Sequence, residues 1–176
     1  LRPGVPGVGD GSERPAPDMT YDIPAHHPNC FGCGTENPSS MGLEMHIVDR
    51  RVLGTIRFAS HHEGGPGLAH GGAVAAVFDD VLGAVPSALH LPAVTASLTV
   101  EFRAPAVLGD DLEVEAHLER RDGRKLHTRG TMHHGTALLA EAHALFIVVD
   151  LAHFRRTGQP LPDAWSHWGD TPGPDR

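Results

Sequence analysis

The chain lacks several features that mark particular classes of protein. It contains no basic run, and its 14 lysine and arginine residues are outnumbered by 22 aspartate and glutamate residues, giving a net charge of −8 with histidine neutral. This balance argues against nucleic-acid binding, which needs a cationic surface. The uninterrupted apolar runs are far shorter than a membrane span, and no signal-peptide pattern opens the chain. We therefore expect no nucleic-acid or membrane partner, and a cytoplasmic location.

Cysteine is also scarce. Cys30 and Cys33 are the two cysteines of the chain, too close together to staple a fold and too few for a secreted disulfide scaffold. Together with His26 they have the spacing of metal ligands, and a zinc site would need a fourth ligand such as His61 or His62. Structural thiols are the preferred interpretation, so we expect no cofactor; a zinc site and a redox pair are the alternatives.

Turn-forming residues are concentrated at the two ends of the chain, although there are 21 glycines and 15 prolines in all. Residues 1–25 are predicted to be a disordered arm, because their start has no apolar period. Residues 155–176 form a tail rich in proline, glycine and aspartate, which Trp165 and Trp168 attach to the body. Residues 26–154 are predicted to be one domain.

Apolar periodicity within this domain predicts the order β-β-α-β-β-β-β, an α+β fold with one long helix among antiparallel strands. The predicted elements are a hairpin over about 43–58, a helix over about 70–89, and strands over about 94–102, 112–119, 125–133 and 137–150. Strict alternation in the strand after the helix places Thr95 on the face opposite Leu98.

The predicted helix has two unlike faces. One face carries an apolar stripe with a period of 3.6 residues, whereas the other is made of glycine and alanine together with Asp79 and Asp80. Such a small, mostly apolar face predicts a helix enclosed by its own sheet and by a second subunit. A carboxylate there is costly unless it has partners or a task. Alternatively, both aspartates lie at an exposed edge and aid solubility.

The helix begins with His70-Gly71-Gly72 after a loop rich in glycine and proline. Glycines let the backbone approach a ligand closely, and the first-turn N–H groups of a helix have no acceptor within the helix. Together with the helix dipole, these donors can stabilise a developing oxyanion.

The segment from His70-Gly71-Gly72 to Asp79 resembles the corresponding segment of hotdog-fold acyl-CoA thioesterases of the phenylacetate-pathway type and of the small human thioesterase superfamily. The run from Val94 to Pro105 and the following Gly109-Asp110-Asp111-Leu112 also match. The resemblance implies a hotdog fold, in which a curved antiparallel sheet wraps one helix. A Cys-x-x-Cys-Gly lead-in, which starts here at Cys30, also occurs in related proteins and suggests a lid or entry segment over the site.

The resemblance also implies roles for single residues. Asp79 takes the place of the catalytic carboxylate, as nucleophile or as general base for water, and the Gly71 N–H takes the place of the oxyanion donor. Thr95 helps to position the water or the acid. His70 more readily orders the loop than transfers protons.

Two glycines lie at the expected substrate position, and one neighbouring acid is left without a role. Gly72 follows the oxyanion donor, and Gly64 stands where some relatives have an asparagine that contacts the thioester. Asp80 points about 100° away from Asp79 on a helix, so no catalytic role is expected for it.

Geometry predicts how the chains assemble. Gly71 and Asp79 are eight residues apart on one helix, about 12 Å, whereas a reacting carbonyl must lie about 3 Å from its donors and within reach of the carboxylate. Two antiparallel helices across a dimer axis satisfy both conditions, as the resemblance implies. We expect a homodimer or a dimer of dimers (a homotetramer).

The predicted function is hydrolysis of an acyl-CoA or acyl-carrier thioester at this dimer interface. Arg121, Arg124 and Lys125 are candidates to contact the phosphates of CoA; a solvated hairpin tip is the alternative. The rival functions are a hotdog dehydratase or isomerase, in which His70 would act chemically, and a non-catalytic acyl-CoA-binding scaffold. The identity of the acyl group is not predicted, because its pocket draws on residues scattered over the strands.

Overall fold

The computed structural model describes residues 21–23, 27–165 and 168. The predicted order of one helix and six strands is confirmed, and a two-residue strand and three short helical segments are added. The elements are β1 (Tyr21–Asp22), β2 (Glu44–Val48), β3 (Arg51–Ile56), η1 (Ser60–His62), α1 (Gly71–Ala88), β4 (Ala93–Phe102), β5 (Leu112–Asp122), β6 (Lys125–His134), β7 (Ala137–Val148), α2 (Leu151–Arg155) and η2 (Asp163–Trp165).

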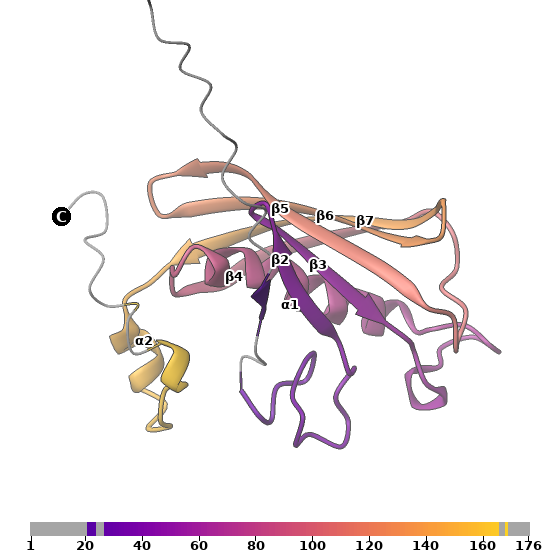
Figure 1. Cartoon of the computed structure of the whole chain (residues 1–176), viewed down its shortest axis with the longest axis horizontal. Helices are drawn as coiled ribbons and strands as arrows, with labels where there is room; N and C mark the ends of the chain where they lie inside the picture. Colours follow the sequence, from indigo (N-terminus) through magenta and orange to yellow (C-terminus); the bar gives the residue numbers. More distant parts are fainter. Residues whose placement is uncertain (1–20, 24–26, 166–167, 169–176) are drawn as a thin grey trace, which may run out of the picture.

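All the strands belong to one antiparallel sheet in the order β1-β2-β3-β5-β6-β7-β4. The chain leaves the middle of the sheet after β3, passes through α1, and returns as β4 at the far edge. The sheet curves over α1, which contacts the strands from β3 to β7 (Figure 1). This arrangement is the hotdog fold, with the helix against the concave face of the sheet.

The predicted apolar stripe of α1 is buried against the sheet. Its members are Val74, Val77, Phe78, Val81, Leu82 and Val85, each no more than 4% exposed. Burial of such a side chain contributes about 1.5–3 kcal/mol, so this stripe fixes the rotation of α1 about its axis. By length and hydropathy alone, α1 could cross a membrane, which the short apolar runs in the sequence did not indicate. Half of this 18-residue helix is buried inside the fold.

The predicted first hairpin is confirmed, and its turn is tight. Asp49 and Arg50, between β2 and β3, have φ angles of 48° and 65°, as the two central residues of a type I′ turn require. The register places Val48 opposite Arg51, so the loop has two residues.

The described parts of both ends continue the fold. In the segment predicted as an arm, Tyr21 and Asp22 form β1 and pair with β2. In the tail, the ring of Trp165 lies 5.0 Å from that of Phe154 in α2, and Trp168 stacks on Trp165 at 4.7 Å. Aromatic contacts thus attach the described part of the tail to α2.

Candidate active site

The N-terminus of α1 is capped by the residue that precedes it. His70 has extended backbone angles, its Nδ1 accepts a hydrogen bond from the Gly72 N–H at 2.8 Å, and its carbonyl accepts from the N–H groups of Ala73 and Val74. By contrast, the N–H of Gly71 donates to no acceptor among the described residues. A single backbone donor at the positive end of the helix dipole is therefore left for a ligand.

The loop before α1 packs so closely that glycine is needed in it. A Cβ at Gly64 would lie 2.8 Å from His70 Cα, and a Cβ at Gly72 would lie 2.9 Å from His70 Nδ1. Gly64 and Gly72 thus let His70 reach its capping position. A longer side chain at position 64 would meet the backbone of His70 first.

A pocket of about 370 Å³ opens beside Gly71. Its lining is mostly apolar: Ala69, Gly71, Val74, Phe102, Arg103, Ala104, Pro105, Ala106, Met132, Leu139 and Ala140. Sequence reasoning did not identify this lining, because it comes from α1, three strands and the segment after β4. An apolar pocket next to a free backbone donor suits an acyl chain whose polar end lies at the donor.

Asp79 lies in the middle of α1 and is held by Thr95 of β4. The Thr95 hydroxyl donates a hydrogen bond to Asp79 Oδ1 at 2.9 Å. Both residues are exposed in the single chain, so the sheet of the same chain does not enclose Asp79 as the sequence predicted. The predicted pairing of Asp79 with Thr95 is present.

A β-bulge brings Thr95 to this position. Thr95 pairs with Phe146 and Ser97 pairs with Leu145, so Ala96 is an extra residue in β4. Residues directly opposite each other in an antiparallel pair point to the same face, and Phe146 is buried in the core. The strict alternation predicted for this strand, which places Thr95 on the outer face, is therefore wrong at the bulge.

One chain does not bring the donor and the carboxylate together. Gly71 lies beside Phe102 near the end of β4, whereas Asp79 contacts Thr95 near its start. Eight residues of helix separate them, about 12 Å along the axis. The predicted donor and the predicted carboxylate thus lie at separate places along one helix.

The three predicted phosphate-binding cations lie at the tip of the β5–β6 hairpin. Arg121 donates to the Gly123 carbonyl and Arg124 to the Val148 carbonyl, and all three cations are exposed. Across the sheet, Lys125 pairs with Ile147 of β7, which in turn pairs with Val94 of β4. The hairpin tip is therefore in register with the residue just before Thr95. Two strand spacings, about 10 Å, separate this tip from β4.

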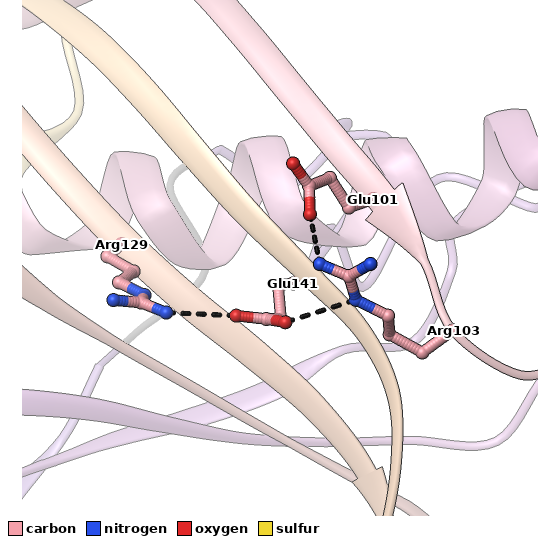
Figure 2. Close-up of polar contacts among 4 residues, drawn as sticks. All are labelled: Glu101, Arg103, Arg129 and Glu141. Carbon is pink, nitrogen blue, oxygen red and sulfur yellow. Dashed lines mark hydrogen bonds and ion pairs between the residues drawn. The ribbon is translucent and has the colours of Figure 1, made fainter.

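A network of charges on the outer face of the sheet holds Arg103 at the rim of the pocket. Arg103 bonds to Glu101 and to Glu141, and Glu141 also accepts from Arg129 at 2.9 Å (Figure 2). The hydrogen bonds from Arg129 and Arg103 hold the pKa of Glu141 below its usual value. Sequence reasoning missed this network, because its members come from three strands and from the residue just after β4.

The predicted metal ligands are divided by the fold. Cys30 and Cys33 lie beside Asp80, which was expected to have no role. His26 is outside the described residues. His62 is buried beside Phe58, and its carbonyl accepts from the N–H of His70.

His61 and His62 are therefore wrong as additional ligands. His70 precedes Asp80 by ten residues, about 15 Å of helix, so η1 lies far from the cysteines. Burial and the neighbouring His61 lower the pKa of His62, which favours its neutral form.

Comparison with known proteins agrees with the fold. A family model described as the thioesterase superfamily matches residues 66–141. The acyl-coenzyme A thioesterase THEM4 of Xenopus laevis is 35% identical over 102 residues, which cover 57% of this chain and 46% of the relative. The chain thus spans about half the length of the curated relatives it matches.

Solved structures show the same architecture. The thioesterase superfamily protein RHA08564 superposes with a TM-score of 0.65 and 27% identity, covering 68% of this chain and 60% of that one. A hypothetical thioesterase protein of Streptococcus pneumoniae TIGR4, solved with coenzyme A, superposes with a TM-score of 0.55 and 19% identity. The match covers 56% of this chain and 81% of that chain, and at this identity it is evidence for the fold only. The predicted resemblance is confirmed: residues 66–141 match the thioesterase superfamily model, and the chain has the hotdog fold of these structures.

Proposed function

We propose that this protein hydrolyses acyl-CoA or acyl-carrier thioesters at sites shared between two chains. The observation that carries the proposal is the pair of half-sites on α1: a carboxylate oriented by Thr95, and a backbone donor without an acceptor among the described residues. The superfamily match and the acyl-CoA thioesterase relatives support the reaction type.

The edge strand supports the assembly into a dimer. β4 ends the sheet, and its first eight residues carry no charge. Long edge strands without lysine, proline or other interruptions readily pair with another chain. Pairing of two β4 strands would set two α1 helices antiparallel, so that Gly71 of one chain faces Asp79 of the other and both aspartates are covered.

Asp79 supplies the base or the nucleophile. As a base, it takes a proton from water while the water oxygen bonds to the carbonyl carbon, and the C=O electron pair moves onto oxygen. Collapse of this intermediate re-forms C=O and breaks the C–S bond, so a carboxylic acid and a thiolate leave. As a nucleophile, Asp79 bonds to the carbonyl carbon and the C–S bond breaks, which releases the thiolate and leaves a mixed anhydride; water then hydrolyses the anhydride to the carboxylic acid and frees Asp79.

The Gly71 N–H stabilises the oxyanion in either case, and the Thr95 hydroxyl orients the carboxylate. Such a donor contributes about 10²–10³ in rate in hydrolases. A thiolate leaves readily, so no strong general acid is needed, and His70 remains a helix cap. Arg121, Arg124 and Lys125 are the residues proposed to contact the phosphates of CoA.

Thiol release tests the proposal directly. The full chain is assayed with short, long and aryl acyl-CoA esters and with an acyl-carrier protein, and its mass in solution is measured by light scattering. We expect thiol release from at least one class, absent in D79N, by a dimer or tetramer. Binding of CoA without thiol release from any substrate would overturn hydrolysis and leave a binding scaffold.

A further inference from the structure

Cys30, Cys33 and Asp80 form a cluster that the proposed hydrolysis does not use. Their ligand atoms all lie within 4.8 Å of one another, and the Cys30 Sγ is 3.5 Å from Asp80 Oδ1. The cysteines are not joined by a disulfide. Cys33 is buried and the other two are half-buried. Two soft ligands and one carboxylate thus converge from two segments that lie 50 residues apart in the sequence.

The backbone of the cysteine loop is shaped to bring these atoms together. A Cβ at Gly32 would lie 2.2 Å from the Asp80 carboxylate, so only glycine lets the loop approach α1 this closely. The Gly32 carbonyl accepts from the N–H of Leu43, and the Phe31 carbonyl accepts from that of Met41. These bonds join the loop to the segment just before β2.

The distance between Cys30 and Asp80 fits a tetrahedral zinc ion. With Zn–S about 2.3 Å and Zn–O about 2.0 Å, two tetrahedral ligands lie about 3.5 Å apart for sulfur and oxygen and about 3.8 Å apart for two sulfurs. The Cys30–Asp80 distance of 3.5 Å equals the first of these values.

Charge also favours a cation at this cluster, because a carboxylate lies against Cys30. Two thiolates and a carboxylate together carry three negative charges, and such a set gathers stably around a divalent ion.

We propose that Cys30, Cys33 and Asp80 bind one zinc ion and supply three of its four ligands. The ion ties the cysteine loop to α1 one residue beyond Asp79. Adjacent aspartates thereby take separate tasks: Asp79 faces β4 and the reaction, and Asp80 faces the loop and the metal.

Metal analysis of the full chain tests this site. Protein purified under reducing conditions without chelator is expected to bind one zinc per chain, and Co²⁺ to give the thiolate charge-transfer and tetrahedral absorption bands. D80N should weaken binding by about 100-fold or more, because loss of an outer-sphere partner alone already costs about 10–100-fold. D79N is the matched control, with the same charge change one residue away and unchanged affinity.

A second measurement on the unaltered chain guards against variants that fail to fold. Titration of the two thiols with a mercurial should release the zinc in proportion to the thiols blocked. Absence of zinc and Co²⁺ binding, or equal affinity in D80N and the unaltered chain, overturns the proposal. Because D79N should abolish hydrolysis and keep the metal, failure of the zinc site is distinguishable from failure of the thioesterase.

Discussion

The two half-sites on α1 are built by different means. At its N-terminus, Gly64, His70 and Gly72 fix a backbone donor through close packing and a cap. In its middle, Asp79 depends on a threonine that a bulge turns inward. The first half-site is local in the sequence, whereas the second needs the register of the sheet. Each can therefore be removed without disturbing the other.

The largest effect is expected at the carboxylate. D79N keeps the shape of the side chain but removes the base, so kcat should fall by about 10²–10⁴. D80N should change kcat much less, since Asp80 faces the cysteine loop. Equal losses in the two variants, measured by thiol release, would contradict the separate roles of these neighbours.

The donor half-site is tested by a change that removes only an N–H. G71P places proline at the first position of α1, where it is tolerated, and His70 has the ψ of 136° that suits a residue before proline. We expect kcat to fall by about 10²–10³.

G71A is the control for this change, because it keeps the N–H and its Cβ would lie at an ordinary 3.4 Å from Phe102. Similar rates in G71P and the unaltered chain would remove Gly71 from the mechanism.

The hydroxyl of Thr95 should matter less than either half-site. T95V keeps the branched shape and removes a hydrogen bond to a charged group, which contributes about 1.5–3 kcal/mol, so kcat should fall by about 10–100-fold. T99V is the matched control, because Thr99 is opposite the exposed His143 on the outer face. A full rate in T95V would show that Asp79 is oriented by something else.

His70 should affect stability more than chemistry. H70A removes the cap of α1 and should lower the free energy of unfolding by about 0.5–2 kcal/mol, while H70N, which can cap, should restore most of the stability and the rate. Loss of activity in H70N as complete as in D79N would favour a dehydratase or isomerase.

The smallest expected effect is a dependence on pH at the loop before α1. The pKa of His62 is lowered, so the unfolded chain binds a proton more readily than the folded one. Its contribution to stability is thus full above the usual histidine pKa and falls as the pH drops through that range. Urea unfolding of the unaltered chain and of H62Q between pH 8 and 5 should show a smaller loss in the variant; equal losses would contradict this assignment.

The features that the sequence predicted correctly are those that depend on residues close together in the chain. The stripe of α1, the capped glycine start and the alternating strands repeat over a few residues, so their elements and order were predictable. Thr95 was assigned to the wrong face because nothing in the strand sequence marks the bulge at Ala96. The contact of Asp80 with Cys30 joins residues 50 positions apart. Helix periodicity could show that Asp80 points away from Asp79, but it could not show that Asp80 meets the cysteine loop.

The sharing of the site between two chains is tested most directly by mixing D79N and G71P, each of which alone should keep at most about 1% of the rate. In a mixed dimer, Gly71 of the first chain and Asp79 of the second form one intact site, and the other site carries both changes. Random pairing should therefore restore about a quarter of the activity of the unaltered protein. If each chain carried its own complete site, the mixture would stay inactive, and the account would be wrong.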